Sequence, residues 1–155
     1  RTKNPFDNAT PSGNSMGTLA LLRLAALSGD VGLREKADLT LRLFGDLMRR
    51  SPSSCAQMIC ALDFFQESPY EIAFVGSGGG RKPFLKALHE RFLPNKVLLA
   101  AEPANYGETL VDGLPLLAGK LGDDEDLLKV YVCRDSVCSQ PVNQIDDLIE
   151  LLKFP

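Results

Sequence analysis

The sequence contains a single histidine, no apolar run near the length of a membrane-spanning helix, and no recognisable signal peptide. A spanning helix needs about 18 consecutive apolar residues, so we expect no membrane segment. The one histidine, His89, stands beside charged neighbours on a predicted helix and is expected at the surface. No Ser-His-Asp arrangement for nucleophilic catalysis can be argued from it.

Basic clusters and spaced metal ligands are also missing. The net charge is -3, and the nearest approach to a basic cluster is Arg81-Lys82, which is too small to indicate a nucleic-acid groove. The acidic run 123–126 lacks the spaced oxygens and the glycine of a calcium loop, so we expect a solvated turn. The sequence therefore predicts no metal site, no cofactor and no nucleic-acid partner.

What is present fits an ordinary globular protein. The 155 residues, of which 45% are hydrophobic and 24% charged, suit one domain or two small lobes that share a core. The chain begins at Arg1 rather than methionine, so we expect a fragment of something longer. We expect a cytoplasmic location, or secretion if a signal lies in a missing N-terminal part.

Residues 1–68 predict three helices. The first, 14–28, is apolar all round and ends at Gly29, so we expect it to be buried on every side. The second, 31–50, carries one apolar stripe, and the third, 53–66, is again mainly apolar. An inner–outer–inner order of this kind builds a double-layered helical ring. Three helices cannot close a ring, so we expect the partner helices to be absent or to lie in another chain.

Residues 69–155 change to an alternation of strands and helices. We predict strands over 71–76, 96–101 and 128–133, with helices over 82–92 and 144–152. This alternation favours a parallel sheet with right-handed crossovers. The predicted fold class is therefore α/β (mixed): a three-helix segment over 1–68, then a lobe over 69–155 with a small three-stranded, mainly parallel sheet and helices.

The turn from Asp7 to Ser15 feeds the first helix and concentrates hydroxyls, amides, a carboxylate and free backbone N–H groups. One interpretation is a ligand site whose polar side chains contact sugar hydroxyls: Asp7, Asn8, Ser12 and Asn14. In that site Asp7 could also act as an acid or base. The favoured interpretation is a helix cap, in which Ser12 or a neighbour caps the helix and Asp7 complements its dipole. No second carboxylate for paired acid–base chemistry is identifiable nearby.

A glycine-rich loop, Gly76-Ser77-Gly78-Gly79-Gly80, follows a predicted strand and precedes a helix, which is the context of phosphate-binding loops. The details differ from the known patterns. Arg81-Lys82-Pro83 stands where a P-loop has Gly-Lys-Ser/Thr, and the dinucleotide pattern needs glycine at position 81. We expect a flexible turn, or a weak anion site formed by Ser77, Arg81 and Lys82. Nucleotide binding is the less favoured alternative.

Two of the four cysteines lie at the end of the third predicted strand, Cys133 as its last residue and Cys138 just past it. Two cysteines do not make a zinc site. Reduced structural thiols are the default expectation, a local disulfide or redox pair is the alternative, and a metal site comes third. The other two, Cys55 and Cys60, point about 140° apart on a helix and are expected to be buried thiols.

Several motifs, in order along the chain, resemble one known family. They are Asp7-x-Ala9-x-Pro11-Ser12-x-Asn14-Ser15, then Leu21-Leu22-Arg23-Leu24, then Pro94-Asn95-Lys96-Val97, then Tyr131-Val132-Cys133-x4-Cys138-x2-Pro141-Val142. With them the chain resembles the C-terminal end of the spermatogenesis-associated protein 20 family, whose bacterial relatives are described as thioredoxin-domain-containing proteins. The resemblance runs along essentially the whole chain.

The resemblance implies a fold for the full-length protein, namely an N-terminal thioredoxin-like domain followed by an (α/α)6 toroid similar to six-hairpin glycosidases. This chain would then hold the last toroid helices and a C-terminal α/β lobe. Its partner would be the remainder of the full-length chain, and a carbohydrate is a possible ligand. No C-x-x-C motif is present, so the redox activity of the thioredoxin-like part cannot be placed on these residues.

Three functions are compatible with these observations. The preferred one is the C-terminal part of such a protein, with a carbohydrate-related or redox-linked role in the intact molecule and no catalysis by the fragment itself. The second is a non-catalytic interaction or scaffold module, which is indicated if the apolar first helix faces solvent. The third is a small nucleotide- or anion-binding α/β domain.

Overall fold

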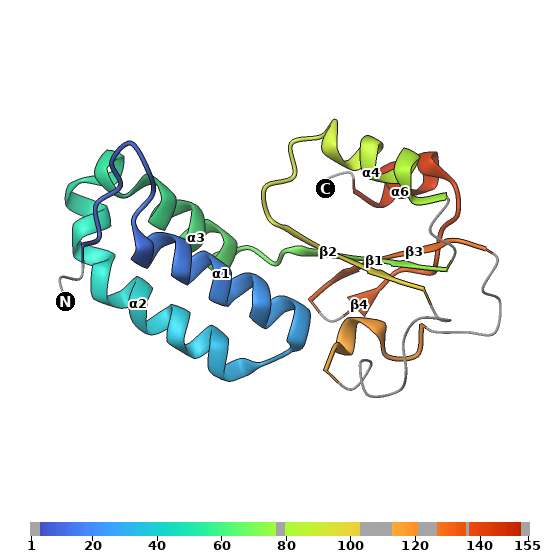
Figure 1. Ribbon diagram of the computed structural model, residues 1–155, viewed down its shortest axis with the longest axis horizontal. Coiled ribbons are helices and arrows are strands. Elements are labelled where there is room, and N and C mark those ends of the chain that lie inside the picture. Colours follow the sequence, from blue (N-terminus) through green and yellow to red (C-terminus); the bar gives the residue numbers. More distant parts are fainter. Residues whose placement is uncertain (1–3, 77–79, 103–112, 121–126, 136, 153–155) are drawn as a thin grey trace. The chain divides into compact units, whose positions relative to one another are not determined.

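The computed structural model describes residues 4–76, 80–102, 113–120, 127–135 and 137–152. The chain divides into two compact units, Arg1–Ser68 and Pro69–Pro155. The first unit is helical, and the second combines a sheet with helices (Figure 1). None of the described helices is long and apolar enough to cross a bilayer.

Local signals set the ends of the helices in the first unit. These elements are α1 (Gly13–Ser28), α2 (Val31–Arg50), a 3-10 turn η1 (Pro52–Cys55) and α3 (Ala56–Gln66). Gly29 ends α1 with a φ of 68°, in the left-handed region that glycine adopts readily. The Asp30 carboxylate then caps α2 by accepting from the backbone N–H groups of Gly32 (2.8 Å) and Leu33 (3.3 Å). The prediction of three helices is confirmed, except that the third begins as a 3-10 turn.

α1 packs against both α2 and α3, and these contacts bury one side of it. The buried residues of α1 are Ser15, Thr18, Leu19 and Leu22. Met16 and Leu24 on the same helix are 48% and 52% exposed. The prediction that this helix is buried on every side is therefore wrong, because two flanking helices cannot cover the whole circumference of a third.

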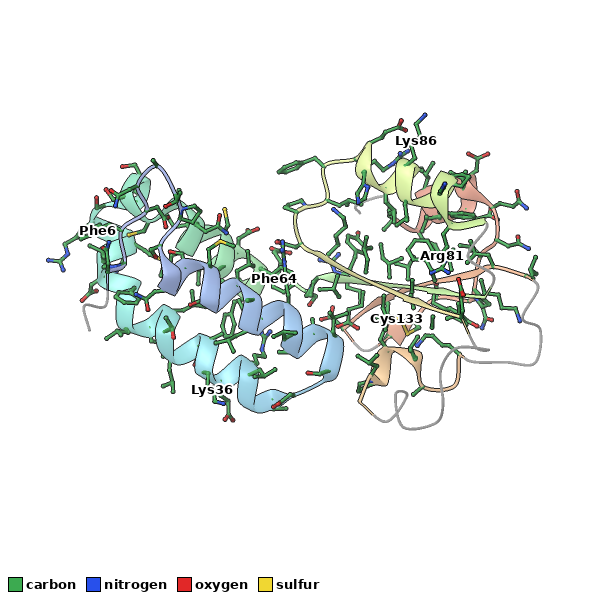
Figure 2. The ribbon with its side chains drawn as sticks, viewed as in Figure 1. Phe6, Lys36, Phe64, Arg81, Lys86 and Cys133 are labelled. Atoms are coloured by element: carbon green, nitrogen blue, oxygen red, sulfur yellow. A yellow bond between two sulfur atoms is a disulfide. The ribbon has the colours of Figure 1, made fainter. Side chains whose placement is uncertain are left out.

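The core of the helical unit is built from apolar side chains of all three helices. Those from α2 and α3 are Ala37, Leu41, Met48, Met58, Ala61 and Phe64. They recur at intervals of three, four or seven residues, so each helix turns a single stripe inward. Phe64 is one of the largest of the fully buried side chains (Figure 2).

The described residues of the second unit form a four-stranded sheet with the order β2-β1-β3-β4. Its strands are β1 (Tyr70–Val75), β2 (Lys96–Ala101), β3 (Lys129–Arg134) and β4 (Val137–Cys138). Its described helices are α4 (Arg81–His89), the 3-10 turn η4 (Pro115–Leu117) and α6 (Ile145–Leu151). β1 and β2 are parallel, whereas β3 is antiparallel to both β1 and β4.

The prediction of three, mainly parallel strands is wrong in both number and direction. The crossover through α4 gives one parallel pair, as expected, but β3 enters the sheet against the direction of β1. β4 has only two residues and follows β3 after a tight turn in which Asp135 has a φ of 52°. So short a strand shows no alternation of apolar and polar residues, which is why the sequence does not reveal it. The mixed helix-and-sheet fold itself is confirmed.

Two apolar cores lie on opposite faces of the sheet. α4 and α6 cover the face that carries Ile72 and Phe74 (Figure 1). η4 lies against the face that carries Ala73 and Val75. Because side chains alternate along a strand, Glu71 points to the same face as Ala73, which places one acidic residue beside the second core.

Candidate functional site

Asp7 lies in the polar turn that precedes α1, and it joins the starts of two helices. Its backbone N–H donates to the carbonyl of Ser54 over 2.8 Å. One carboxylate oxygen, Oδ1, accepts from the backbone N–H of Ser12 (2.8 Å) and from the hydroxyl of Ser15 (3.1 Å). The other, Oδ2, accepts from the backbone N–H of Gln57 (2.7 Å) in the first turn of α3. Both oxygens are therefore occupied within the helical unit.

Ser12 is the N-cap residue of α1. Its Oγ accepts from the backbone N–H of Ser15 over 3.0 Å and lies 2.8 Å from the hydroxyl oxygen of the same residue. Ser12 is 6% exposed and Ser15 is fully buried, so a ligand cannot reach either hydroxyl in this conformation. The favoured interpretation, in which Ser12 or a neighbour caps the helix, is confirmed, and Ser12 is the residue that does so.

The surroundings of Asp7 keep its carboxyl group ionised. Burial by itself would raise the pKa, but the hydrogen bonds from Ser12, Gln57 and Ser15 hold the pKa of Asp7 below its ordinary value of 3.8. A carboxylate with a lowered pKa and two occupied oxygens is poorly suited to acid–base catalysis near neutral pH. Its position instead suits it to compensate the unpaired N–H groups at two helix N-termini.

The two asparagines of the turn differ in their surroundings. Asn8 is exposed, and its backbone N–H donates to the carbonyl of Thr10 over 3.0 Å. Asn14 donates from Nδ2 to the backbone carbonyl of Asn4 over 2.8 Å. Three residues of the predicted sugar-binding set make hydrogen bonds within the fold, namely Asp7, Ser12 and Asn14. The fourth, Asn8, is exposed. Sugar binding by this set stays a prediction.

The predicted anion site before and within α4 is described only in part. Ser77 lies outside the described residues. Arg81 pairs with Glu102, just past β2, and its side chain is 20% exposed (Figure 2). Lys82 is exposed. An anion at Arg81 would have to compete with the carboxylate of Glu102, and the anion site stays a prediction.

Cys133 and Cys138 are joined by a disulfide, with an S–S distance of 2.05 Å and 3.9 Å between the Cα atoms. They are direct partners in the register of β3 and β4. The default expectation of reduced thiols is therefore wrong, and the local disulfide describes the pair. No three His, Cys, Asp or Glu side chains of the described residues gather closely enough to hold a metal ion. Cys55 is buried as predicted, whereas Cys60 is exposed, against the prediction.

A further group of polar side chains, which no sequence motif indicated, surrounds Glu71 on the sheet. Glu71 is half-buried and is the register partner of Cys133. Burial raises the pKa of the Glu71 carboxyl, Lys120 lowers it, Asp135 raises it, and the net pKa is above the ordinary 4.5. Burial lowers the pKa of Lys120, and its Nζ lies 5.6 Å from the ring centre of Tyr131. The one signal available was an acidic residue within an otherwise apolar strand.

A groove of about 590 Å³ opens in the helical unit between α2 and α3. Its apolar lining comes from Leu41, Met48, Ile59, Leu62 and Phe65. Its charged lining consists of two ion pairs on α2, Arg42 with Asp38 and Arg49 with Asp46. The paired charges cancel, so the groove offers an apolar surface with a polar border rather than a charged pocket.

Comparison with known proteins finds relatives along nearly the whole chain. It is 33% identical over 156 residues to spermatogenesis-associated protein 20 of Rattus norvegicus, and equally to that of Homo sapiens. Each match covers 98% of the chain, while the chain spans 19% of each relative's length. No family model and no solved structure matches the chain. On this similarity, which extends over both units, the chain belongs to the spermatogenesis-associated protein 20 family.

Proposed function

We propose that the helical unit is a non-catalytic interaction module that packs against further helices of a longer chain. The observation that carries this proposal is the exposed apolar surface of α1. Met16, Ala20 and Leu24, which we call the α1 stripe, follow one another at intervals of four residues and are all exposed. Large exposed apolar patches are typical of surfaces that a partner covers.

The groove between α2 and α3 supplies a second contact surface. Its five apolar side chains would accept the apolar ridge of another helix, as ridges fit into grooves in helix packing. The ion pairs of α2 would then meet the polar flanks of that helix. An amphipathic helix therefore matches the chemistry of the groove better than a small polar ligand does.

The length of the relatives supports helices of the same longer chain as the occupants of both surfaces. The chain spans 19% of the relatives' length, so most of their residues lie outside the matched segment. In this proposal the three helices form part of a closed double layer, the (α/α)6 toroid that the family resemblance implies. The partner is then the remainder of the longer chain.

A carbohydrate-related role belongs, in this proposal, to the longer protein rather than to this chain alone. The occupied carboxylate of Asp7 supports that division, because it leaves the turn a capped helix end rather than an acid or base. Asn8 is exposed in the same turn and is the side chain that we expect to meet a sugar.

We expect Leu24→Glu to affect the longer protein much more than the isolated chain. In the isolated chain Leu24 is 52% exposed, so a glutamate there should change the free energy of unfolding by less than about 0.5 kcal/mol. In the longer protein the same carboxylate would be buried without a partner, and we expect a loss of about 2 kcal/mol. Urea unfolding of both proteins, followed by circular dichroism, measures the difference.

Leu43→Glu provides the matched control for this experiment. Leu43 is 61% exposed on α2 and belongs neither to the α1 stripe nor to the groove. We expect this substitution to leave both proteins close to wild-type stability. Equal losses from the two substitutions in the longer protein would contradict docking through the α1 stripe.

A further inference from the structure

The disulfide of the sheet joins a buried residue to an exposed one. Cys133 lies on β3 and is 1% exposed, whereas Cys138 lies on the edge strand β4 and is exposed. The two are register partners, so their side chains share one face of the sheet (Figure 2). Residue exposure therefore favours the approach of a thiol in solution to Cys138 over Cys133. The cysteine whose sulfur is attacked forms the mixed disulfide, and the other cysteine is the leaving group.

Glu71 extends this arrangement on the opposite side of Cys133. The register pairs Glu71 with Cys133 across β1 and β3, and directly opposed residues in antiparallel strands have Cβ atoms about 5 Å apart. Glu71, Cys133 and Cys138 therefore form a row across three neighbouring strands, on the face that η4 covers. Glu71 and Cys138 lie on either side of Cys133.

Two charged groups of the described residues face Glu71. They are Lys120, from the segment after η4, and Asp135, from the turn between β3 and β4. Burial is the main reason why the pKa of Glu71 is raised, and Asp135 adds to it while Lys120 opposes it. Such a carboxyl changes its protonation closer to neutral pH than an exposed glutamate does. It can therefore both give and take a proton beside a buried sulfur atom.

We propose that Cys133 and Cys138 are a reversible redox pair for low-molecular-weight thiols, and that Glu71 moves the proton of Cys133. In reduction, a thiolate RS⁻ attacks the sulfur of Cys138, and a new S–S bond to R forms as the Cys133–Cys138 bond breaks. The sulfur of Cys133 leaves with the bonding electron pair and takes the proton of Glu71. A second thiolate attacks the sulfur of R, so RSSR and the Cys138 thiolate are released, and the latter takes a proton from solvent. The protein gains two electrons, which the two thiols lose.

In oxidation the same steps run in reverse. The Cys138 thiolate first attacks RSSR, which breaks the RS–SR bond, releases RS⁻ and leaves the mixed disulfide on Cys138. The Glu71 carboxylate then takes the proton of the Cys133 thiol. The resulting thiolate attacks Cys138 and expels RS⁻. Burial disfavours a thiolate, so without Glu71 the buried thiol would lose its proton slowly. The mixed disulfide should then persist. This proposal depends on the second unit alone and is independent of docking by the helices.

Glu71→Gln is expected to trap the mixed disulfide. The reduced full chain, with Cys60→Ser to remove the other exposed thiol, is mixed with oxidised glutathione and quenched at intervals. Mass spectrometry separates the open, glutathionylated and closed forms, and peptide mapping locates the adduct. With Glu71 present, the glutathione adduct on Cys138 should be converted to the Cys133–Cys138 disulfide without accumulating. With glutamine, we expect ring closure near neutral pH to be roughly 10- to 100-fold slower.

The controls distinguish proton transfer from a structural effect. Glu90→Gln makes the same change at an exposed position after α4. In this variant the Cys133–Cys138 disulfide should form from the mixed disulfide at the wild-type rate. Glu71→Asp keeps an acid and should recover part of the rate. The defect of Glu71→Gln should shrink as the pH rises past the ordinary thiol pKa of about 8.5, because more of the buried thiol then ionises without Glu71. Wild-type closure in Glu71→Gln, or a disulfide that glutathione cannot open in the folded chain, would overturn the proposal.

Discussion

We expect Asp7→Ala to lower the free energy of unfolding of the helical unit by about 3 kcal/mol. The substitution removes three hydrogen bonds to one carboxylate and takes the acceptor from the N–H groups of Ser12 and Gln57. A hydrogen bond to a charged group contributes roughly 1.5–3 kcal/mol, and an unpaired buried donor costs a similar amount. The total is smaller than the sum because the three bonds share one group.

Urea unfolding followed by circular dichroism measures this loss, and amide hydrogen exchange at Ser12 and Gln57 localises it. Asp46→Ala is the matched control, because Asp46 is an exposed carboxylate paired with Arg49 on α2. Exposed pairs of this kind contribute little, so we expect a change below about 0.5 kcal/mol. Unchanged stability and unchanged exchange in Asp7→Ala would contradict the capping role and return Asp7 to the ligand-binding candidates.

The capping role of Asp7 also predicts how stability depends on pH. The hydrogen bonds lower the pKa of Asp7 in the folded chain below its ordinary value of 3.8. The stability that these hydrogen bonds contribute is therefore complete above the ordinary pKa of Asp7, and it is lost as the pH falls through the lower pKa of the folded state. The difference in unfolding free energy between wild type and Asp7→Ala should shrink in acid. Unfolding curves recorded at several acidic pH values check this direction.

We expect Gly76→Ala to lower the free energy of unfolding of the second unit by about 3 kcal/mol. Gly76 follows β1 with a φ of +116°, which L side chains rarely adopt. A Cβ at this position would also lie 3.1 Å from the carbonyl carbon of Leu127 and 3.2 Å from the Cα of Leu128. These are backbone atoms, so the segment before β3 would have to move away from the end of β1.

Gly119→Ala separates the two causes of this loss. Gly119 also has a positive φ, +69°, but no atom lies within 4 Å of an added Cβ. Its substitution should cost about 1 kcal/mol, the cost of the left-handed conformation alone. Denaturant unfolding compares the variants, and hydrogen exchange at the Gly76 amide, bonded to the Ala101 carbonyl over 3.1 Å, reports the local effect. Equal losses at the two glycines would contradict the close approach of Leu127.

The ends of the helices could be predicted because their signals are local. Gly29 and Asp30 stop one helix and start the next through contacts with residues at most four positions away. The first helix shows the limit of such reasoning. Its composition predicts burial on all sides, but exposure depends on how many neighbours are present, and α1 has two helical neighbours in its unit. Composition states which surfaces are apolar and not which of them are covered.

The surroundings of Asp7 and of Glu71 are formed by residues that lie far from them in the sequence. Asp7 is bonded to Gln57, 50 residues away, and only the packing of α1 against α3 brings the two together. Glu71 meets Cys133 because β3 runs antiparallel to β1 in one particular register. A shift of that register by one residue would turn Cys133 to the other face of the sheet. No motif in the sequence carries that information.

The sequence by itself determined the family, the three helices and the places of the long strands, and it favoured a helix cap at Ser12 or a neighbour. Each of these features depends on residues that are close together in the sequence, because periodicity and capping act over a few positions. Only the tertiary structure decided the direction of β3, the Cys133–Cys138 bond and the occupation of both oxygens of Asp7. These features depend on which distant segments meet and in which register. That choice follows from the packing of the whole unit rather than from any single stretch.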